Sequence, residues 1–300
     1  MNSIFADIVI KQPSKLMKIK TLKRLIYCFP ALLVSFSFFS LKSYATPVEH
    51  ILPDSSQTPG FKVKTVIVDA GHGGFRAGAS GAYSVEKNVT LQIAFKLQKA
   101  IEKELNDVKV VMTRTTDEDI LWQKRATIAN ENKGDLFVSI HCNSLADRVT
   151  TVKGKRVRVP NRSGKGVLLL VYGFHRTKEE EKAIKETRFE DDDEMNAAFD
   201  PNDPAALILL NEYKRKYRKQ SIRFANLLSD EFSNDGRRIE GIREQGVLVL
   251  CRSAMPAVLV ETGYINNPDE EEYLNSEAGQ NEIVASIVKA IRNFKKEVEN

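Results

Sequence analysis

Residues 65–74 of the sequence read TVIVDAGHGG. The run at residues 65–69 shows no alternation of polar and apolar positions, which is typical of a strand covered on both faces. It leads into a histidine set among glycines, where the backbone is free to turn tightly and to approach other groups closely. The stretch therefore predicts a buried strand of an α/β sheet, with His72 just beyond its carboxyl end.

Short apolar runs alternate with helical patterns along the rest of the chain, which indicates a largely parallel sheet. One apolar stripe repeats every four positions over residues 89–105, a second helix is expected after Asn267, and a terminal helix covers residues 283–294. We predict a mostly parallel twisted sheet of about six strands flanked by helices, in a single domain at residues 61–300. The expected strands are residues 65–69, 108–113, 136–140, 166–172, 247–251 and 257–260.

The composition is that of an ordinary globular protein. Of the 300 residues, 42% are apolar and 28% are charged, which excludes a collagen, a coiled coil or a wholly disordered chain. Residues 1–45 hold seven of the 45 basic and one of the 40 acidic residues, so the remaining 255 residues carry 38 basic and 39 acidic side chains. Because no overall basic field remains, we expect no nucleic-acid partner and no binding to anionic lipid.

Residues 1–45 have the pattern of an export signal. A basic stretch precedes an apolar run at residues 25–41, and small residues precede a cleavage site after Ala45. Met17 offers an alternative start that gives a signal of more typical length. An uncleaved anchor is the other interpretation, but the apolar run is at the lower limit for spanning a bilayer. We expect a signal peptide, a linker at residues 46–60, and an exported protein without a stable membrane anchor, periplasmic or, alternatively, secreted.

Two cysteines, Cys142 and Cys251, lie outside this leader. Two cysteines in an exported domain of this size do not form a disulfide framework. Because both lie in apolar, strand-like surroundings, we predict buried thiols, with a single disulfide as the alternative.

Residues 175–200 do not fit the alternation of strands and helices. They are crowded with charged side chains, and a long helical pattern follows at residues 203–228. A solvated surface excursion is the usual meaning of such a charge run, and a mobile lid is the alternative. We expect residues 175–235 to form a helical insertion in this domain.

Three apolar runs end in residues able to bind a metal or to move a proton, namely His72, His141 and Glu261. The carboxyl ends of parallel strands lie along one edge of a sheet, so these residues are expected to converge. Glu86 begins the helix after the first strand, near the same edge. Two histidines and a carboxylate form a catalytic zinc set, and a further carboxylate is what hydrolysis needs to move protons. We therefore expect a site for one Zn²⁺ ion.

Each of these residues also has a structural interpretation when it is taken alone. His72 could be a turn residue, and Glu86 could favour a helix N-terminus through the helix dipole. Glu261 is harder to explain in that way, because a carboxylate that ends an apolar run is costly to bury unless it is paired or lies near a metal.

Four blocks of the sequence resemble one family in their order and spacing. They are VIVDAGHGG (66–74), VEKNVTLQIAFKL (85–97), TR with RATIAN and DLFVSIHCNS (113–144), and MPAVLVETGYINNPDE (255–270). The chain resembles the zinc-dependent N-acetylmuramoyl-L-alanine amidases of bacterial cell walls. The resemblance covers residues 63–145 and 240–300, and four separate blocks make it highly specific.

The resemblance implies a six-stranded α/β domain with one zinc, held by His72, Glu86 and His141. It implies that Glu261 is the catalytic acid and base, and that Asn143 lies near the substrate. The expected reaction is hydrolysis of the amide between N-acetylmuramic acid and L-alanine of the stem peptide of peptidoglycan. A catalytically silent peptidoglycan-binding protein and a zinc peptidase acting within the stem peptide are the alternatives.

The insertion is similar to that of the family's cell-division members, in which an acidic helix crosses the zinc and a partner protein displaces it. By this resemblance, residues 175–200 are autoinhibitory, Glu186 or Glu190 blocks the metal, and a protein activator is a further partner. A carboxylate in the open position of zinc would exclude the attacking water. The resemblance also implies that Arg125 and Asn130 brace the fold.

Overall fold

The computed structural model describes residues 61–173, 177–188 and 204–300, all within one unit, Gln57–Asn300. At its centre is a six-stranded sheet in the order β2-β1-β3-β8-β6-β7. Four of the five neighbouring pairs are parallel, and β6 runs antiparallel to β8. The predicted α/β fold with a mostly parallel sheet is confirmed. The strands are β1 (Thr65–Ala70), β2 (Lys109–Met112), β3 (Leu136–Asn143), β6 (Val167–Tyr172), β7 (Ile239–Gln245) and β8 (Ala257–Tyr264).

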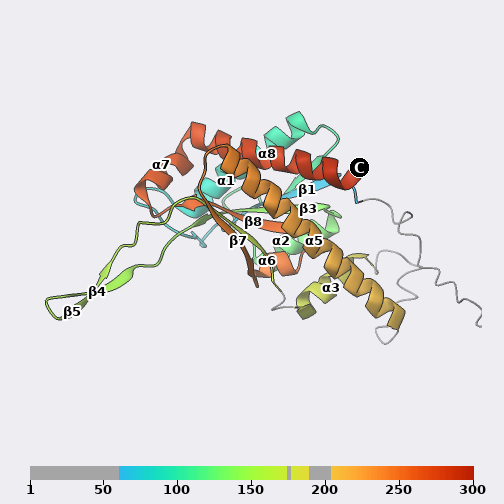
Figure 1. Cartoon of the computed structure of the whole chain (residues 1–300), viewed down its shortest axis with the longest axis horizontal. Coiled ribbons are helices and arrows are strands. Elements are labelled where there is room, and N and C mark those ends of the chain that lie inside the picture. Colours follow the sequence, from blue (N-terminus) through green and yellow to red (C-terminus); the bar gives the residue numbers. More distant parts are fainter. Residues whose placement is uncertain (1–60, 174–176, 189–203) are drawn as a thin grey trace, which may run out of the picture. The chain divides into compact units, whose positions relative to one another are not determined.

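Helices cover both faces of the sheet (Figure 1). On one face lie the three long helices, and on the other lie two shorter ones, with a third packed against these two. The long helices are α1 (Glu86–Glu104), α5 (Pro204–Asn234) and α8 (Glu277–Glu299), and the shorter ones are α2 (Trp122–Glu131), α6 (Leu248–Cys251) and α3 (Thr177–Arg188).

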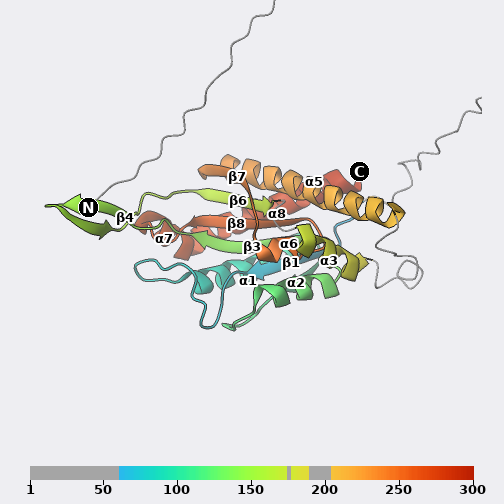
Figure 2. The same ribbon diagram turned by 90° about the horizontal axis from the view of Figure 1, so that it is seen from below.

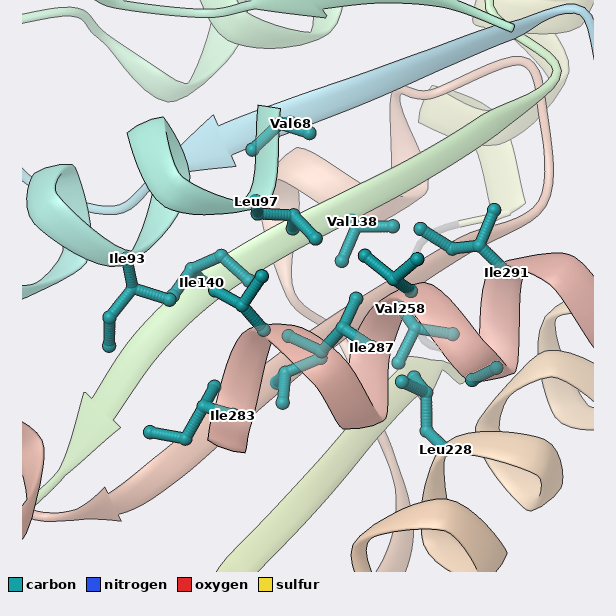
Figure 3. Close-up of a cluster of buried hydrophobic side chains, with 14 of the residues drawn as sticks. Val68, Ile93, Leu97, Val138, Ile140, Leu228, Val258, Ile283, Ile287 and Ile291 are labelled. Atoms are coloured by element: carbon teal, nitrogen blue, oxygen red, sulfur yellow. The ribbon is translucent and has the colours of Figure 1, made fainter. Parts of the chain in front are cut away.

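The near-continuous apolar runs arise because alternate side chains of each central strand enter two different cores. Val138 and Ile140 of β3 pack with the long helices, whereas Phe137 packs with α2 and α6 on the opposite face. In Figure 3, Leu97 of α1 and Ile287 of α8 lie near these β3 side chains. This two-sided burial fixes the strand ends that carry the candidate site.

One predicted strand is wrong. Residues 247–251 form the short helix α6 at Leu248–Cys251, and the sixth strand is β7, which the sequence interpretation missed. The run VLVLC is too short to show a helical or strand period, and its side chains pack into the core beside α2. β7 is an edge strand with partly exposed residues, so it lacks the apolar signature of the central strands.

A hairpin that the sequence interpretation also missed follows β3. Its strands, β4 (Arg148–Val152) and β5 (Lys155–Val159), pair antiparallel and form a separate two-stranded sheet. The hairpin extends away from the six-stranded sheet (Figures 1 and 2).

The expected helices are present with slightly different bounds. The helical pattern at residues 203–228 is α5, which continues to Asn234. The helix expected after Asn267 is α7 (Pro268–Asn275), and the Asn267 side chain accepts hydrogen bonds from the first-turn amides of Asp269 and Glu270. Cys142 and Cys251 are buried free thiols, as predicted, and no disulfide joins them.

Several predictions concern residues outside this description. The signal peptide at 1–45, the linker at 46–60 and Glu190 lie there. Within the described ranges, no helix combines the length and the apolar character needed to cross a membrane.

Candidate metal centre

His72 lies in the loop that joins β1 to α1, in a backbone conformation that side chains rarely adopt. Its φ angle of 59° lies in the left-handed region, and Gly73 follows with a φ angle of 133°. Such a conformation persists only where surrounding contacts hold it. Arg125 of α2 does so by donating hydrogen bonds to the carbonyl oxygens of His72 and Ala70, each at 2.5 Å. A side chain from another part of the chain therefore holds the conformation of this loop.

A second buried guanidinium, that of Arg114, holds the same loop. It donates hydrogen bonds to the carbonyl oxygens of Ala70 and Gly71, each at 2.9 Å. Asp69, which is fully buried, pairs with Arg125 at 2.7 Å and balances part of this positive charge. The sequence interpretation did not single out Arg114 or Asp69. The signal available was Asp69 itself, an acid within an apolar run.

Glu86 is the centre of a three-residue group. Its Oε2 lies 3.2 Å from His72 Nε2 and its Oε1 lies 2.9 Å from His141 Nδ1. One ligand atom from each of the three residues lies within 4.8 Å of the others. The backbone amides of Ala79 and Cys142 donate to the two carboxylate oxygens at 2.7 and 3.0 Å. The three side chains thus converge on one small volume.

The charges within this group stabilise one another. Burial alone would raise the pKa of Glu86, but hydrogen bonds and the charges of the two histidines outweigh burial and lower this pKa. The Glu86 carboxylate is therefore ionised. Burial alone would lower the pKa of His141, but Glu86 raises it overall. A buried carboxylate flanked by two imidazoles is a donor set suited to a divalent cation such as zinc.

Two glycines make room for this group. A Cβ atom at Gly71 would lie 2.5 Å from the ring of His141, and one at Gly78 would lie 2.4 Å from Glu86 Oε2. Gly78 also has a φ angle of 74°, which other residues rarely adopt. Backbone rather than side chain therefore lines this side of the histidines and the carboxylate.

Glu261 lies on β8 in register with His141 of β3. Its Oε2 atom is buried and has no hydrogen-bond partner among the residues that the structure describes. Burial raises the pKa of Glu261 to about 7, although the charge of His141 lowers it. A buried carboxylate left without a partner is costly, and such groups are concentrated at functional sites.

The candidates for substrate binding and for autoinhibition, Asn143 and Glu186, lie on different elements. Asn143 lies at the end of β3, two residues beyond His141, and its Oδ1 accepts a hydrogen bond from the Ser144 amide at 2.8 Å. Glu186 lies exposed on α3 and pairs with Lys182 at 3.3 Å.

The structure does not bring Glu186 to the metal group. Because β6 runs antiparallel to β8, its carboxyl end lies at the end of the sheet opposite to Glu261. The next helix, α3, follows β6 from that end. Autoinhibition by residues 175–200 stays a prediction, because much of that segment lies outside the described residues.

The two residues expected to brace the fold bind backbone groups. Arg125 holds the β1–α1 loop, as described above. Asn130 of α2 donates to the carbonyl oxygen of Arg252 and accepts from the amide of Ala254, both at 2.9 Å. Asn130 thus joins α2 to the segment that precedes β8.

A cavity of about 300 Å³ adjoins the carboxyl ends of β3 and β8, the end of the sheet that carries the metal group. Its lining includes Ser80 from the β1–α1 loop, Ser144 just after β3, and Glu271 of α7. It continues to Asp147 and Arg162, at the two ends of the hairpin. The sequence interpretation did not predict this cavity, because its walls come from four loops that are distant in the chain.

The fold and the site together define a class. A mostly parallel α/β sheet with a His-Glu-His group at one strand edge, and an unpaired carboxylate in register beside it, has the composition of a mononuclear metallohydrolase site.

Comparison with known proteins gives the family. The family model described as N-acetylmuramoyl-L-alanine amidase matches residues 66–293, and the chain belongs to this family. It is 31% identical over 231 residues to the amidase AmiC of Escherichia coli O6:H1, a match covering 76% of this chain and 52% of AmiC. The chain thus spans about half the length of that relative.

Two further similarities cover nearly the whole of the matched protein. A putative N-acetylmuramoyl-L-alanine amidase of Buchnera aphidicola subsp. Baizongia pistaciae is 31% identical over 242 residues, which is 76% of this chain and 95% of that protein. Among solved structures, the catalytic domain of the amidase CwlV from Bacillus (Paenibacillus) polymyxa var. colistinus superposes with a TM-score of 0.54. It has 25% sequence identity, and the match covers 79% of this chain and 99% of that domain.

Proposed function

We propose that this protein hydrolyses peptidoglycan at the amide that joins the lactyl group of N-acetylmuramic acid to L-alanine of the stem peptide. The observation that carries the proposal is the unpaired, buried oxygen of Glu261, in register with a histidine of the metal group. A carboxyl group with a pKa of about 7 accepts and releases a proton near neutral pH, as general acid–base catalysis requires. Membership of the amidase family supports the choice of bond.

The proposal assigns one Zn²⁺ ion to His72, Glu86 and His141. When bound, zinc would polarise the scissile carbonyl group and lower the pKa of water. Glu261 accepts a proton from the attacking water and then donates it to the leaving amine of L-alanine. Arg125 holds the His72 carbonyl, so that the imidazole keeps its orientation.

Digestion of purified peptidoglycan tests the reaction. Zinc-loaded protein should release peptides that begin with L-alanine and leave glycan chains with an intact lactyl group, as identified by mass spectrometry. Glu261→Gln should retain zinc while product formation falls by about a hundredfold or more. Glu104→Gln, on the exposed end of α1, is the matched control.

Three outcomes would contradict the proposal. Turnover retained in zinc-loaded Glu261→Gln would remove Glu261 from the mechanism. Cleavage within the stem peptide would indicate a zinc peptidase. Binding to peptidoglycan with no product, under conditions in which zinc is bound, would indicate a binding protein without this activity.

We also infer that the protein acts outside the cytoplasm, in the periplasm. The leader pattern at residues 1–45 supports export, and peptidoglycan lies beyond the cytoplasmic membrane. Cell fractionation followed by N-terminal sequencing should find a mature chain that begins at Thr46. An intact leader on a protein retained in the cytoplasm would contradict export.

A further inference from the structure

The β4–β5 hairpin and its flanks are strongly basic, although the chain outside the leader has almost no net charge. Residues 147–165 contain seven basic residues and one acid, Asp147. The basic residues are Arg148, Lys153, Lys155, Arg156, Arg158, Arg162 and Lys165. A charge sum over the whole chain conceals this local cluster.

The hairpin is an extended arm with no core of its own. A two-residue turn at Lys153 and Gly154, with φ angles of 48° and 75°, joins strands whose ten residues are all exposed. Positive φ angles at both turn positions match the twist of a tight hairpin. A two-stranded hairpin without packing is marginally stable in water, so these residues add little to the stability of the domain.

Basic side chains lie on both faces of the arm. Cross-strand partners share a face, so Arg148 and Lys155 lie on the same side as Val152, Val157 and Val159. Arg156 and Arg158 lie on the other side, opposite Thr151 and Val149 respectively. Neither face of the two strands carries an acidic side chain.

The cations of the arm are not neutralised by ion pairs within the described part of the chain. Among the described residues, none of Lys153, Lys155, Arg156 and Arg158 forms an ion pair. Basic residues of the neighbouring β1–α1 region behave differently, since Lys87 pairs with Asp117 at 2.6 Å. The positive charge of the arm is therefore available to an anionic partner.

The arm adjoins a cavity at the same end of the sheet as the candidate site. It begins seven residues after His141 along the chain, and the residues at its two ends, Asp147 and Arg162, line the cavity of about 300 Å³ beside the metal-bearing edge. A polymer that occupies this cavity would meet the basic arm as it leaves the cavity.

We propose that the β4–β5 hairpin binds the free carboxylates of peptidoglycan stem peptides and so holds the polymer at the site. This inference rests on the proposed function, because it takes peptidoglycan as the occupant of the cavity. Stem peptides repeat along the glycan chain, so several carboxylates can contact the arm at once. A small fragment with a single stem peptide occupies the site alone and gains nothing from the arm.

The test measures binding separately from catalysis. The exported protein, without its leader and carrying Glu261→Gln, is cosedimented with insoluble peptidoglycan. The peptidoglycan has been freed of protein and of phosphate polymers. The triple variant Lys155→Gln, Arg156→Gln, Arg158→Gln should bind about tenfold more weakly, as expected for the loss of three exposed ionic contacts. A matched triple variant at the exposed residues Lys99, Lys103 and Lys219 loses the same charge and should bind normally.

Chemical modification of the polymer identifies the group that is bound. Amidation of the peptidoglycan carboxylates should weaken binding of the parent protein about tenfold and abolish its advantage over the glutamine variant. The charge-conserving variant Lys155→Arg, Arg156→Lys, Arg158→Lys should bind untreated peptidoglycan like the parent. With Glu261 restored, the glutamine variant should show a KM about tenfold higher on the polymer, with kcat and cleavage of a soluble disaccharide-peptide unchanged.

Several results would overturn the inference. They are equal binding by the glutamine variant and the parent, an unchanged difference on amidated peptidoglycan, or hairpin-dependent binding to phosphatidylglycerol vesicles but not to peptidoglycan. Hairpin-dependent binding without amide cleavage would contradict the proposed function but still support binding of the polymer by the arm. Amide cleavage with hairpin-independent binding would do the reverse.

Discussion

The loop after β1 and the hairpin after β3 follow neighbouring strands of the sheet, but they differ in whether their charged side chains are paired. In the loop after β1, Arg76 pairs with Asp119, and the polar atoms of Glu86 are all engaged by histidines and backbone amides. In the hairpin after β3, exposed cations face solvent without ion pairs among the described residues. A preorganised metal group needs internally satisfied ligands, whereas a surface that binds a polyanion must leave its charges free. The difference indicates which partner each segment serves.

The largest effect is expected where the charges are buried. Glu86→Ala removes a carboxylate that accepts from Ala79 and Cys142 and contacts both histidines. The variant should lose zinc during gel filtration, and its activity should fall more than about a hundredfold. Its free energy of unfolding should fall by about 1–3 kcal/mol, because one buried and one partly buried amide lose their acceptor.

Zinc content by mass spectrometry and chemical denaturation measure these two effects. The matched control is Glu244→Ala on the exposed part of β7, which removes a carboxylate from a partly exposed ion pair. One zinc per chain retained by Glu86→Ala would show that the three-residue group is not the metal site.

The same substitution in the two segments gives an intermediate effect. Gly71→Ala places a methyl group 2.5 Å from the ring of His141, so zinc affinity should fall about tenfold to a hundredfold. Gly154→Ala in the hairpin meets nothing within 4 Å. It should cost only about 1 kcal/mol of turn strain from its positive φ angle and leave zinc affinity unchanged. Competition with a chromogenic chelator measures both affinities, and equal values would contradict the tight packing at Gly71.

Salt should separate the two segments further. Raising the NaCl concentration from about 0.05 to 0.5 M shortens the Debye length to a few ångströms, which screens exposed charges but hardly affects a buried group. Binding to insoluble peptidoglycan should weaken about tenfold, while zinc affinity changes by less than about twofold. Cosedimentation and chelator competition at each salt concentration check this. Salt-independent binding to peptidoglycan would mean that contacts other than the exposed cations hold the polymer.

The comparison also explains what the sequence could predict. His141 and Glu261 follow buried apolar residues of parallel strands, so sheet topology alone places them together. The basic cluster of the hairpin was missed because the total charge of the chain hides it, although valines on both sides of Lys153-Gly154 are a hairpin signal. The cavity depends on how loops distant in the sequence meet, which no local pattern contains.

The smallest effect is expected on α3, where surface charge is paired. Glu186 contacts Lys182 one turn away and lines a small cavity against α2 together with Thr127. Its exposed ion pair is worth little, and β6 delivers α3 to the sheet edge opposite the metal group. Glu186→Ala should therefore leave peptidoglycan hydrolysis within about twofold of the parent and the melting temperature unchanged. A several-fold rise in activity would instead mean that this carboxylate reaches the metal in another arrangement of residues 175–200, and that paired surface charge can also serve the site.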